Sequence, residues 1–492
     1  MSANAALDPG ELLLSANALF CADRSKNLRS VIADKIEGLR HYDVRTMERA
    51  VAICCWGRSG SLLLASYLDG HEDVMMLPTT RSAGIYIFFE RYQSLPLRDK
   101  LIAYPAFTEL WDSAGEENGF GRSFFEGDFA ISSAHYYAAV QAILEVYGTW
   151  PPEFLASRRA FFLFVHIAYN LALGRLPASS QPLIVYAQHE WDNVLASYLI
   201  EDFPQAKFIH TIRDPISSFD RLFDWWFQAA LLKPKDPLRE SNETRPQPGR
   251  RVSAVAPWKV LRHLIDADRP HFGTESRTRA LRFEDLHCDT AETMRALSGW
   301  LGLPYQATLL DSTFNGIPYV VARDGKAWSG PRLEQAQRHS RNVSLKDRAL
   351  LFAFFYENFV AWNYPCPKIF GNPMVRCLVL VLFPLVPMKT EIFVARTVFK
   401  WRVLPALKDG NLSIVMNSLL RILFCRLGII WLSMREVVRR LAYGKKLLQV
   451  DHMRQRTGPL PGDGSGLFFH PKALPGHVEA RYREGNHTNL HS

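Results

Sequence analysis

Residues 51–68 read VAICCWGRSGSLLLASYL. The run opens with six apolar residues typical of a buried strand, passes through the turn at 57–61, and then carries apolar residues at helical spacing. A strand that enters a helix through a glycine-containing turn gathers free backbone N–H groups and the positive end of the helix dipole at one point. The sequence therefore predicts an anion-binding turn, where the Arg58 guanidinium suits phosphate or sulfate oxygens.

The turn lacks the pattern by which P-loop nucleoside triphosphatases hold phosphate. That pattern places a lysine directly after its last glycine, and here Ser61 follows Gly60 with no lysine nearby. The anion site must therefore rely on backbone N–H groups and on Arg58.

A second segment supplies polar groups at the ends of two further predicted strands. Residues 183–191 read LIVYAQHEW, and residues 207–212 form another short apolar run that leads into Arg213-Asp214-Pro215 and a helical stretch over 216–232. Ligands of parallel α/β sheets gather at the carboxyl ends of the strands. We therefore expect His189 and Arg213 to meet the turn at 57–61, whereas His210, inside its strand, is interpreted as a core residue.

Two later segments complete the pattern. Residues 281–286, LRFEDL, are predicted to form a short strand and turn before a helix over 290–301, which Gly302 and Pro304 end. Residues 325–330 read GKAWSG and are predicted to form a loop.

Taken in order over residues 48–365, these motifs resemble the sulfotransferases that use 3′-phosphoadenosine 5′-phosphosulfate (PAPS). The turn at 57–61 resembles their 5′-phosphosulfate loop, Ile-Arg-Asp-Pro at 212–215 their 3′-phosphate motif, and 325–330 the late loop that closes over the nucleotide. The resemblance implies an α/β fold like that of P-loop proteins, with a parallel sheet flanked by helices. It also implies PAPS as co-substrate and no metal.

The resemblance also implies site residues. Those expected to hold the donor are Gly57, Arg58, Ser59, Gly60, Ser61, Leu62, Arg213, Ser217, Ser218 and Lys326. In the family the 3′-phosphate serine often lies eight residues after the arginine, a place that Arg221 occupies here, so Ser217 or Ser218 is the expected replacement.

Sulfuryl transfer requires an in-line acceptor, charge stabilisation on the leaving phosphate, and a base for the acceptor's proton. The catalytic candidates are His189, Glu190 and Arg58. His189 lies where the resemblance places a catalytic histidine, in the run Ala-Gln-His rather than Lys-Thr-His, and Glu190 is the alternative base.

The chain of 492 residues predicts one large α/β domain with extensions. We expect a helical lead-in over 1–47, the α/β domain over 48–370 with a helical cap insertion at 79–180, a surface loop at 233–257, a basic apolar helical extension over 371–450, and a disordered tail over 451–492. Seven cysteines without a C-x-x-C pair indicate reduced, mostly buried thiols, and no secretory signal is recognisable, so a cytoplasmic location is expected.

The net charge of +9 is concentrated in one segment. Residues 371–450 hold thirteen Lys and Arg against three acids, which leaves the rest of the chain at about −1. A long helix is predicted over 412–442, with Asn417, Arg421, Arg435 and Arg439 on one narrow polar stripe. Such a helix favours an anionic membrane surface. Packing on the core, a dimer interface or a membrane span are the alternatives, and the embedded charges argue against nucleic acid.

Three functions are compatible with the sequence. The first is PAPS-dependent sulfuryl transfer to a hydroxyl or amine of a small, lipid-like acceptor. The second is nucleotide-dependent phosphotransfer, which the absent Walker lysine disfavours. The third is a non-catalytic, membrane-peripheral protein that keeps the sulfotransferase fold.

Overall fold

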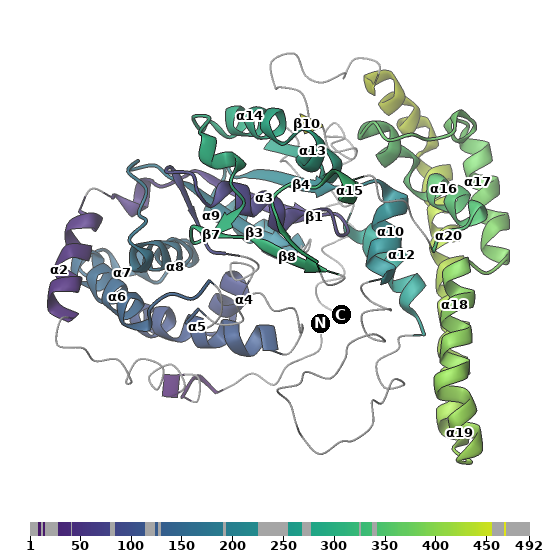
Figure 1. The fold of residues 1–492 in the computed structure, drawn as a ribbon, viewed down its shortest axis with the longest axis horizontal. Helices are drawn as coiled ribbons and strands as arrows, with labels where there is room; N and C mark the ends of the chain where they lie inside the picture. Colours follow the sequence, from purple (N-terminus) through teal and green to yellow (C-terminus); the bar gives the residue numbers. More distant parts are fainter. Residues whose placement is uncertain are drawn as a thin grey trace.

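The computed structural model describes residues 8–10, 13–14, 28–40, 42–78, 84–113, 124–125, 129–189, 193–224, 254–267, 277–323, 326–336, 342–454 and 467–468. At its centre lies a six-stranded sheet with the order β10-β5-β4-β1-β3-β2 (Figure 1). Five strands run parallel: β1 (Ala50–Cys55), β2 (Val74–Met76), β3 (Leu183–His189), β4 (Lys207–Ile212) and β5 (Thr278–Arg282). The predicted α/β fold with a parallel sheet is therefore confirmed.

The central strand β1 is flanked by the two strands that the motifs follow. Cys54 of β1 pairs with His189 of β3 on one side and with His210 of β4 on the other. His210 is 2% exposed, as expected of a core residue. This order brings the carboxyl ends of β1, β3 and β4 together, because parallel neighbours end at the same edge of the sheet.

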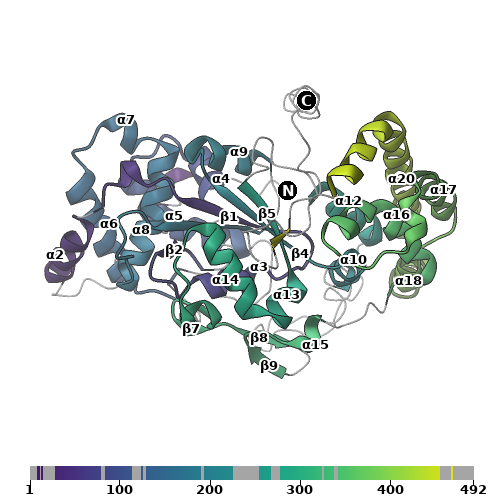
Figure 2. The ribbon, with the colours of Figure 1, turned by 90° about the horizontal axis from the view of Figure 1, so that it is seen from above.

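Helices cover both faces of the sheet (Figures 1 and 2). Those before β5 are α2 (Leu28–Leu39), α3 (Ser61–Leu68), α4 (Gly84–Arg91), α5 (Leu97–Ser113), α6 (Ser133–Tyr147), α7 (Pro152–Leu155), α8 (Arg158–Leu173), α9 (Asn193–Asp202), α10 (Pro215–Phe223) and α12 (Ala256–Ala267). Single 3₁₀ turns lie at η1 (Val44–Thr46), η5 (Ala307–Leu310) and η6 (Lys368–Gly371). After β5 come α13 (Phe283–Cys288), α14 (Thr290–Leu301), two small hairpins β6 (Thr313–Phe314) with β7 (Ile317–Pro318) and β8 (Val320–Arg323) with β9 (Lys326–Ser329), then α15 (Leu333–Ala336) and α16 (Leu345–Ala361).

The insertion between β2 and β3 is helical, as predicted, and its aromatic residues form core. Phe88 of α4 contacts Phe161 of α8 with ring centroids 5.4 Å apart, and both rings are fully buried. Helix α8 begins at the cap Ser157, whose side chain accepts from the Ala160 N–H, and ends at Gly174 in the left-handed region. These helices share one hydrophobic cluster with Ala52 of β1. The insertion therefore builds one side of the domain.

Three local expectations need correction. Residues 283–288 form the short helix α13 rather than a turn, because Phe283 and Leu286 are buried one helical turn apart. The late segment at 326–329 is a strand of an antiparallel hairpin rather than a loop. In the tail expected to be disordered, β10 (Leu467–Phe468) pairs antiparallel with Leu281 and Ala280 and covers the edge of β5.

Other predicted boundaries fall partly outside the described residues. The helix expected over 216–232 is α10, described as far as Phe223, and the loop expected at 233–257 lies outside the described residues except at its end, where α12 begins at Ala256. Helix α14 ends at Gly302 with φ 73°, as the glycine predicts. The thiol prediction holds in part: six described cysteines are free, and only Cys54 and Cys425 are buried.

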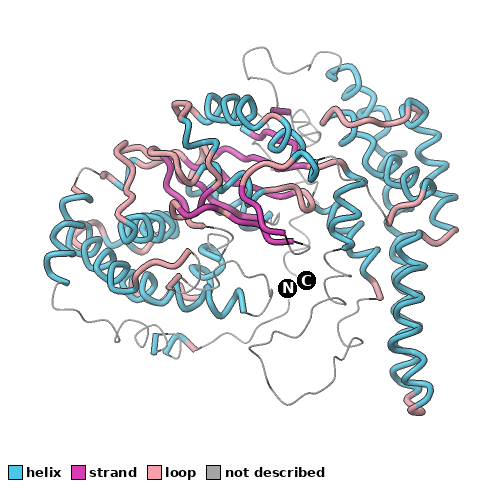
Figure 3. Tube along the Cα trace, viewed as in Figure 1, coloured by secondary structure: helices cyan, strands magenta, loops and turns pink. Residues whose placement is uncertain are grey.

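The C-terminal segment is helical, as predicted, and lies on the side of the sheet beyond α10 and α12 (Figures 1 and 2). It comprises α17 (Pro373–Leu382), η7 (Phe383–Leu385), α18 (Lys389–Val398), the π-helical turn η8 (Phe399–Val403), α19 (Leu404–Lys408) and α20 (Leu412–Arg454). Figure 3 shows this segment as helices joined by short loops. Helices α18 and α20 lie side by side, because Arg426 of α20 pairs with Glu391 of α18 at 3.0 Å. Leu380 and Ile429 of this segment share a hydrophobic cluster with Trp56, which follows β1. The segment is thus packed on the α/β domain through one face.

Candidate active site

The turn at 57–61 follows β1 and opens α3, as the sequence predicts. Gly57 (φ 70°) and Gly60 (φ 83°) both adopt left-handed backbone conformations, and Gly60 is the N-cap of α3. A left-handed conformation is strained for residues with a side chain. The turn therefore aims the first N–H groups of α3, from Ser61 and Leu62 onward, at the carboxyl edge of the sheet, where an anion is favoured.

The turn is fixed to β4 through a buried serine. Ser59 is fully buried, and its hydroxyl donates to the Thr211 carbonyl oxygen at 2.6 Å. The backbone N–H of Trp56 donates to the same carbonyl oxygen at 2.9 Å. Of the predicted donor-binding residues, Ser59 thus uses its hydroxyl to hold the loop, and its backbone N–H donates to the Gly57 carbonyl oxygen at 3.0 Å within the turn.

Both turn glycines are in contact with elements that carry the other motifs. A Cβ atom at Gly57 would lie 2.9 Å from the Ser218 Cβ in α10, and one at Gly60 would lie 2.8 Å from the Phe283 ring at the start of α13. Real Cβ contacts do not reach such distances, so a side chain at either place would displace its neighbour. The close approach joins the phosphate turn to the segments after β4 and β5.

Arg213 lies within the same group of residues. Its side chain is 4% exposed, its guanidinium stacks over the Phe283 ring at 4.3 Å, and its Nη2 donates to the Gln335 carbonyl oxygen at 2.9 Å. Phe283 therefore lies between Gly60 and Arg213. The structure brings together the turn, the arginine and the 281–286 segment that the sequence singled out, and adds α15 through Gln335.

The start of α10 is held by two half-buried carboxylates, Asp214 and Glu284. The Asp214 side chain caps the helix by accepting from the Ser217 N–H at 2.8 Å, and burial raises the pKa of Asp214. The Asp214 N–H donates to Glu284 Oε1 at 3.3 Å, while the Tyr364 hydroxyl donates to Glu284 Oε2 at 2.6 Å. Burial likewise raises the pKa of Glu284. These bonds fix Arg213, the residue before the cap.

The two candidate serines differ in environment. Ser217 is half-buried next to Asp214, whereas Ser218 is fully buried against Gly57. Among the described residues the Ser218 hydroxyl has no hydrogen-bond partner. An unsatisfied buried hydroxyl is costly unless a ligand or water completes it. Ser218 is therefore the serine whose hydroxyl the fold leaves available beside the turn.

Arg58 lies near Tyr319, which stands between β7 and β8. Arg58 is exposed, and its charge acts on Tyr319, whose pKa burial raises to about 12 against the opposing effect of Arg58. His287 of α13 accepts from the Arg332 N–H at 2.8 Å, and burial followed by the Arg213 charge lowers the pKa of His287 to about 4. The sequence did not indicate Phe283, His287 or Tyr319 as site residues. Phe283 lies in the 281–286 motif, but an apolar ring carries no signal of a binding site, and His287 and Tyr319 lie outside the motifs.

Three predicted residues are placed only in part. The backbone of His189 lies at the end of β3 beside Cys54, and that of Lys326 begins β9, but the side chains of both lie outside the described residues. Glu190 lies outside the described residues altogether. The roles of these three remain predictions.

A family model described as "Sulfotransferase family" matches residues 50–307, more than half of the chain. The chain therefore belongs to the sulfotransferase family. The match begins at β1 and ends after α14, and so includes the turn, Arg213 and α13.

Solved structures of sulfotransferases are similar to this chain at low identity. The sulfotransferase STF9 from Mycobacterium avium has 14% identity and a TM-score of 0.33, covering 72% of this chain and 86% of its own. The sulfotransferase domain from the curacin biosynthetic pathway has 16% identity and a TM-score of 0.28, and the match covers 54% of this chain and 77% of that domain. The sulfotransferase domain from the Synechococcus PCC 7002 olefin synthase has 14% identity and a TM-score of 0.28, and the match covers 72% of this chain and 97% of that domain. No curated protein sequence matches the chain.

Proposed function

We propose that the protein transfers a sulfuryl group from PAPS to a hydroxyl or amine of an apolar, lipid-like acceptor. The observation that carries the proposal is the juxtaposition of the glycine turn with Arg213, which share Phe283 as a common neighbour. The turn offers backbone N–H groups to one phosphate and Arg213 offers a charge to a second. A ligand with two separate phosphate groups, as in a 3′,5′-bisphosphate nucleotide, fits this pair.

The residues present fit the donor on chemical grounds. The Ser218 hydroxyl is buried and without a partner among the described residues, and both turn glycines hold the left-handed conformation that forms the turn before α3. Residues 57–62, Arg213 and Ser218 would hold the donor, with Ser217 and Lys326 as further candidates. The bound donor supplies the sulfuryl group and leaves as the bisphosphate.

The protein's own groups would then stabilise the developing negative charge and accept one proton. The turn N–H groups and Arg58 would stabilise the negative charge that develops on the leaving phosphate oxygen as the bond to sulfur breaks. His189 or Glu190 would accept the proton of the attacking hydroxyl or amine, since both follow the strand that pairs with β1 next to the turn.

The acceptor class follows from the surroundings of the domain. The C-terminal helices expose many apolar side chains and are long and apolar enough, by length and composition only, to include two candidate membrane spans, Pro373–Lys408 and Leu412–Leu441. A lipid-like acceptor suits an enzyme that carries such a surface. The six described cysteines are free thiols, which is consistent with an enzyme that acts in a reducing compartment.

The first experiment is calorimetric titration of the full chain with 3′-phosphoadenosine 5′-phosphate, compared with ATP and Mg²⁺. We expect micromolar binding of the bisphosphate that is lost in Arg58→Ala and Arg213→Ala and kept in Arg295→Ala, an exposed surface arginine. Preference for ATP with Mg²⁺ would contradict the proposal and favour phosphotransfer.

Turnover separates an enzyme from a non-catalytic relative. His189→Ala and Glu190→Gln should leave bisphosphate affinity within about threefold while one of them lowers sulfuryl transfer by about 100-fold or more. Donor binding without transfer to any member of a panel of lipid alcohols and amines would support a non-catalytic, membrane-peripheral protein instead.

A further inference from the structure

Exposed apolar residues are concentrated on the C-terminal helices. Of the 32 large apolar side chains that are exposed among the described residues, 23 lie between residues 371 and 441. They include Phe424 at 71% and Trp431 at 55% exposure. Scattered exposed apolar side chains are ordinary, but a contiguous set of this size marks an interaction surface.

Helix α20 carries the most regular part of this surface. At about 100° per residue, ten of its exposed apolar side chains fall within a sector of about 140°. These ten, called here the α20 face, are Leu412, Met416, Leu419, Leu420, Leu423, Phe424, Leu427, Trp431, Val438 and Leu441. The opposite side of the helix is buried and includes Cys425, Ile429 and Leu432.

Arginines follow one edge of the α20 face along its length. Arg421, Arg435 and Arg439 lie about 90–130° from the centre of the face, on the same flank. The Arg435 guanidinium lies 4.9 Å from the Trp431 ring, and in η8 the Lys400 ammonium lies 5.1 Å from the exposed Trp401 ring. Tryptophan beside Lys or Arg is typical of the boundary between water and lipid.

We propose that the α20 face docks this protein on the surface of an anionic lipid bilayer, with α20 lying in the plane of the interface. Charge selects this occupant, because the segment 371–450 carries thirteen Lys and Arg against three acids. Two copies meeting through this face would repel each other, whereas anionic lipid headgroups are complementary to it. The inference is independent of sulfuryl transfer.

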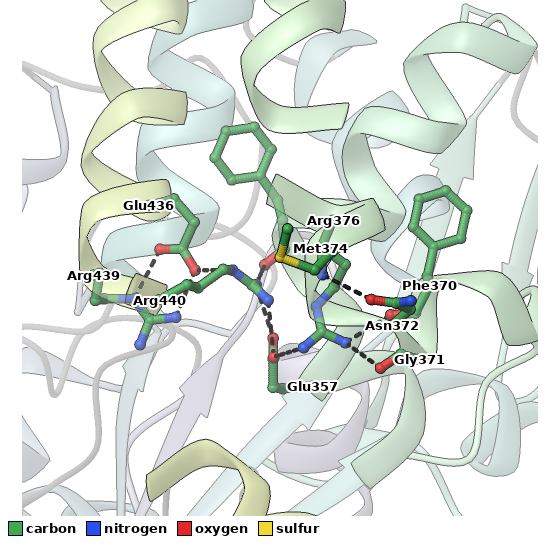
Figure 4. A network of polar contacts seen from close by, with 10 residues as sticks. Glu357, Phe370, Gly371, Asn372, Met374, Arg376, Glu436, Arg439 and Arg440 are labelled. Carbon is green, nitrogen blue, oxygen red and sulfur yellow. Dashed lines mark hydrogen bonds and ion pairs between the residues drawn. The ribbon is translucent and has the colours of Figure 1, made fainter. Parts of the chain in front are cut away.

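The geometry favours an in-plane helix over a spanning one. The α20 face extends over residues 412–441, about 44 Å of helix, whereas the hydrocarbon core of a bilayer is about 30 Å thick. A spanning orientation would also bury the arginines spaced along the helix. On the inner side, Arg440 bonds Glu357 of α16 and Glu436, and Arg376 of α17 contacts the same Glu357 (Figure 4). This buried network holds α20 against the domain.

Helix α12 connects the docking surface to the donor site. Trp258 of α12 lies against Gly428 of α20, within 2.5 Å of where a Cβ would be. At its other end, the Leu264 carbonyl oxygen accepts from the Trp56 indole N–H at 3.1 Å, and Trp56 directly precedes Gly57. Both views show α12 between the sheet and α20 (Figures 1 and 2). Docking through α20 therefore holds the turn close to the membrane.

The test is flotation of the full chain, without donor, on vesicles of phosphatidylcholine alone or mixed with phosphatidylglycerol. Leu423→Asn/Leu427→Asn should weaken binding to the mixed vesicles about tenfold or more, since these side chains lose their burial in lipid. The matched control is Leu310→Asn/Leu345→Asn, which alters two exposed leucines elsewhere and should bind as the unaltered chain does.

The charge contribution is measured with a second pair. Arg421→Gln/Arg435→Gln should weaken binding about tenfold on phosphatidylglycerol vesicles and by less than about twofold on neutral ones. Arg40→Gln/Arg98→Gln, on the surface of the α/β domain, is the control. Absence of vesicle binding, together with a dimer in sedimentation that Leu423→Asn/Leu427→Asn dissociates, would overturn the proposal in favour of a second copy.

Orientation is measured by spin-label depth at Met416→Cys and Val438→Cys, two positions on the α20 face, in a background with the exposed Cys288 changed to serine. Equal depths support the in-plane helix. A difference of about 15 Å or more, half of the hydrocarbon core, would overturn it.

Discussion

At the residue scale, two glycines decide whether the phosphate turn can exist. Gly57 and Gly60 combine a left-handed backbone with neighbours that leave no room for a Cβ atom, whereas Gly174 has a similar φ of 69° and open space around it. The three glycines therefore share backbone strain but differ in how closely neighbouring side chains approach them. Strain is common to all three positions, and contact with Ser218 or Phe283 is peculiar to the turn.

We therefore predict that Gly60→Ala lowers the free energy of unfolding by about 2–4 kcal/mol, from left-handed strain and overpacking against Phe283. Gly174→Ala should lower it by only about 1 kcal/mol. Chemical denaturation measures both. Gly60→Ala should also weaken bisphosphate binding at least tenfold, because Arg213 stacks on the displaced ring. Equal effects of the two variants on stability and binding would contradict this account of the turn.

His287 gives the site a pH dependence of stability. Burial and the Arg213 charge lower its pKa from an ordinary 6.5 to about 4, so the folded state favours the neutral ring. A neutral ring also suits the Nδ1 acceptor of the Arg332 N–H. Stability from this group is complete above pH 6.5 and declines as the pH falls from 6.5 to 4.

We predict that the difference in unfolding free energy between the unaltered chain and His287→Asn changes by about 1–3 kcal/mol across that pH range and is constant outside it. Denaturation at a series of pH values measures the change. A difference that stays flat between pH 6.5 and 4 would show that the histidine titrates normally in the folded state.

At the element scale, a buried ionic network fixes α20 to α16 and α17 (Figure 4). Burial opposes ionisation of Glu357, but Arg440 and Arg376 outweigh it and hold the pKa of Glu357 at about 2. The stability supplied by this carboxylate is therefore present above about pH 4.5 and is lost as the pH falls from 4.5 to 2.

We predict that Arg440→Met lowers the free energy of unfolding by about 3–5 kcal/mol, because it removes from a buried network the cation that bonds both Glu357 and Glu436. Arg421→Met, at an exposed position of the same helix that bonds only Asn417 among the contacts described, should change it by less than about 0.5 kcal/mol. Chemical denaturation at pH 7 tests both, and comparable effects of the two variants would show that the network adds little.

The contact between α12 and α20 offers a second element-scale prediction. Gly428→Val places a branched side chain against Trp258 and should shift α12, whose Leu264 carbonyl accepts from Trp56 beside the turn. We expect bisphosphate binding to weaken about threefold to tenfold. Gly299→Val, in the last turn of α14 with open space around it, is the control for a branched residue in a helix. Unchanged donor affinity in a folded Gly428→Val protein would show that α12 carries no such coupling.

At the scale of the whole molecule, the C-terminal helices belong to the domain core as well as to its surface. Val379, Leu380, Ile429 and Leu432 are buried in one cluster with Trp56 and other residues of the α/β domain. The segment that holds most of the net charge is therefore also part of the hydrophobic core that supports the phosphate turn.

We predict that a chain ending at residue 370 does not fold to a soluble domain. Each large apolar side chain removed from the cluster takes away about 1.5–3 kcal/mol, and the sum exceeds the 5–15 kcal/mol by which domains are stable. A chain ending at Arg454 keeps all these contacts and, of the described residues, loses β10 with its contacts to β5 and α14, so it should unfold cooperatively in calorimetry. A soluble, cooperatively folded chain ending at residue 370 would contradict the shared core.

Local sequence was enough to predict the elements of the site, because strand, turn and helix signals are encoded within a few neighbouring residues. The run at 51–68, the arginine after β4 and the glycine stop at Gly302 all took the predicted structures. The long amphipathic helix from Leu412 followed from periodicity alone.

Only the tertiary structure decided which residues lie together. The positions of Phe283 between Gly60 and Arg213, of Ser218 under Gly57, and of α12 between the turn and α20 depend on packing between segments far apart in the chain. It also decided which side of α20 is buried, because a helix with apolar residues on both sides does not specify which of them packs on the domain and which stays exposed.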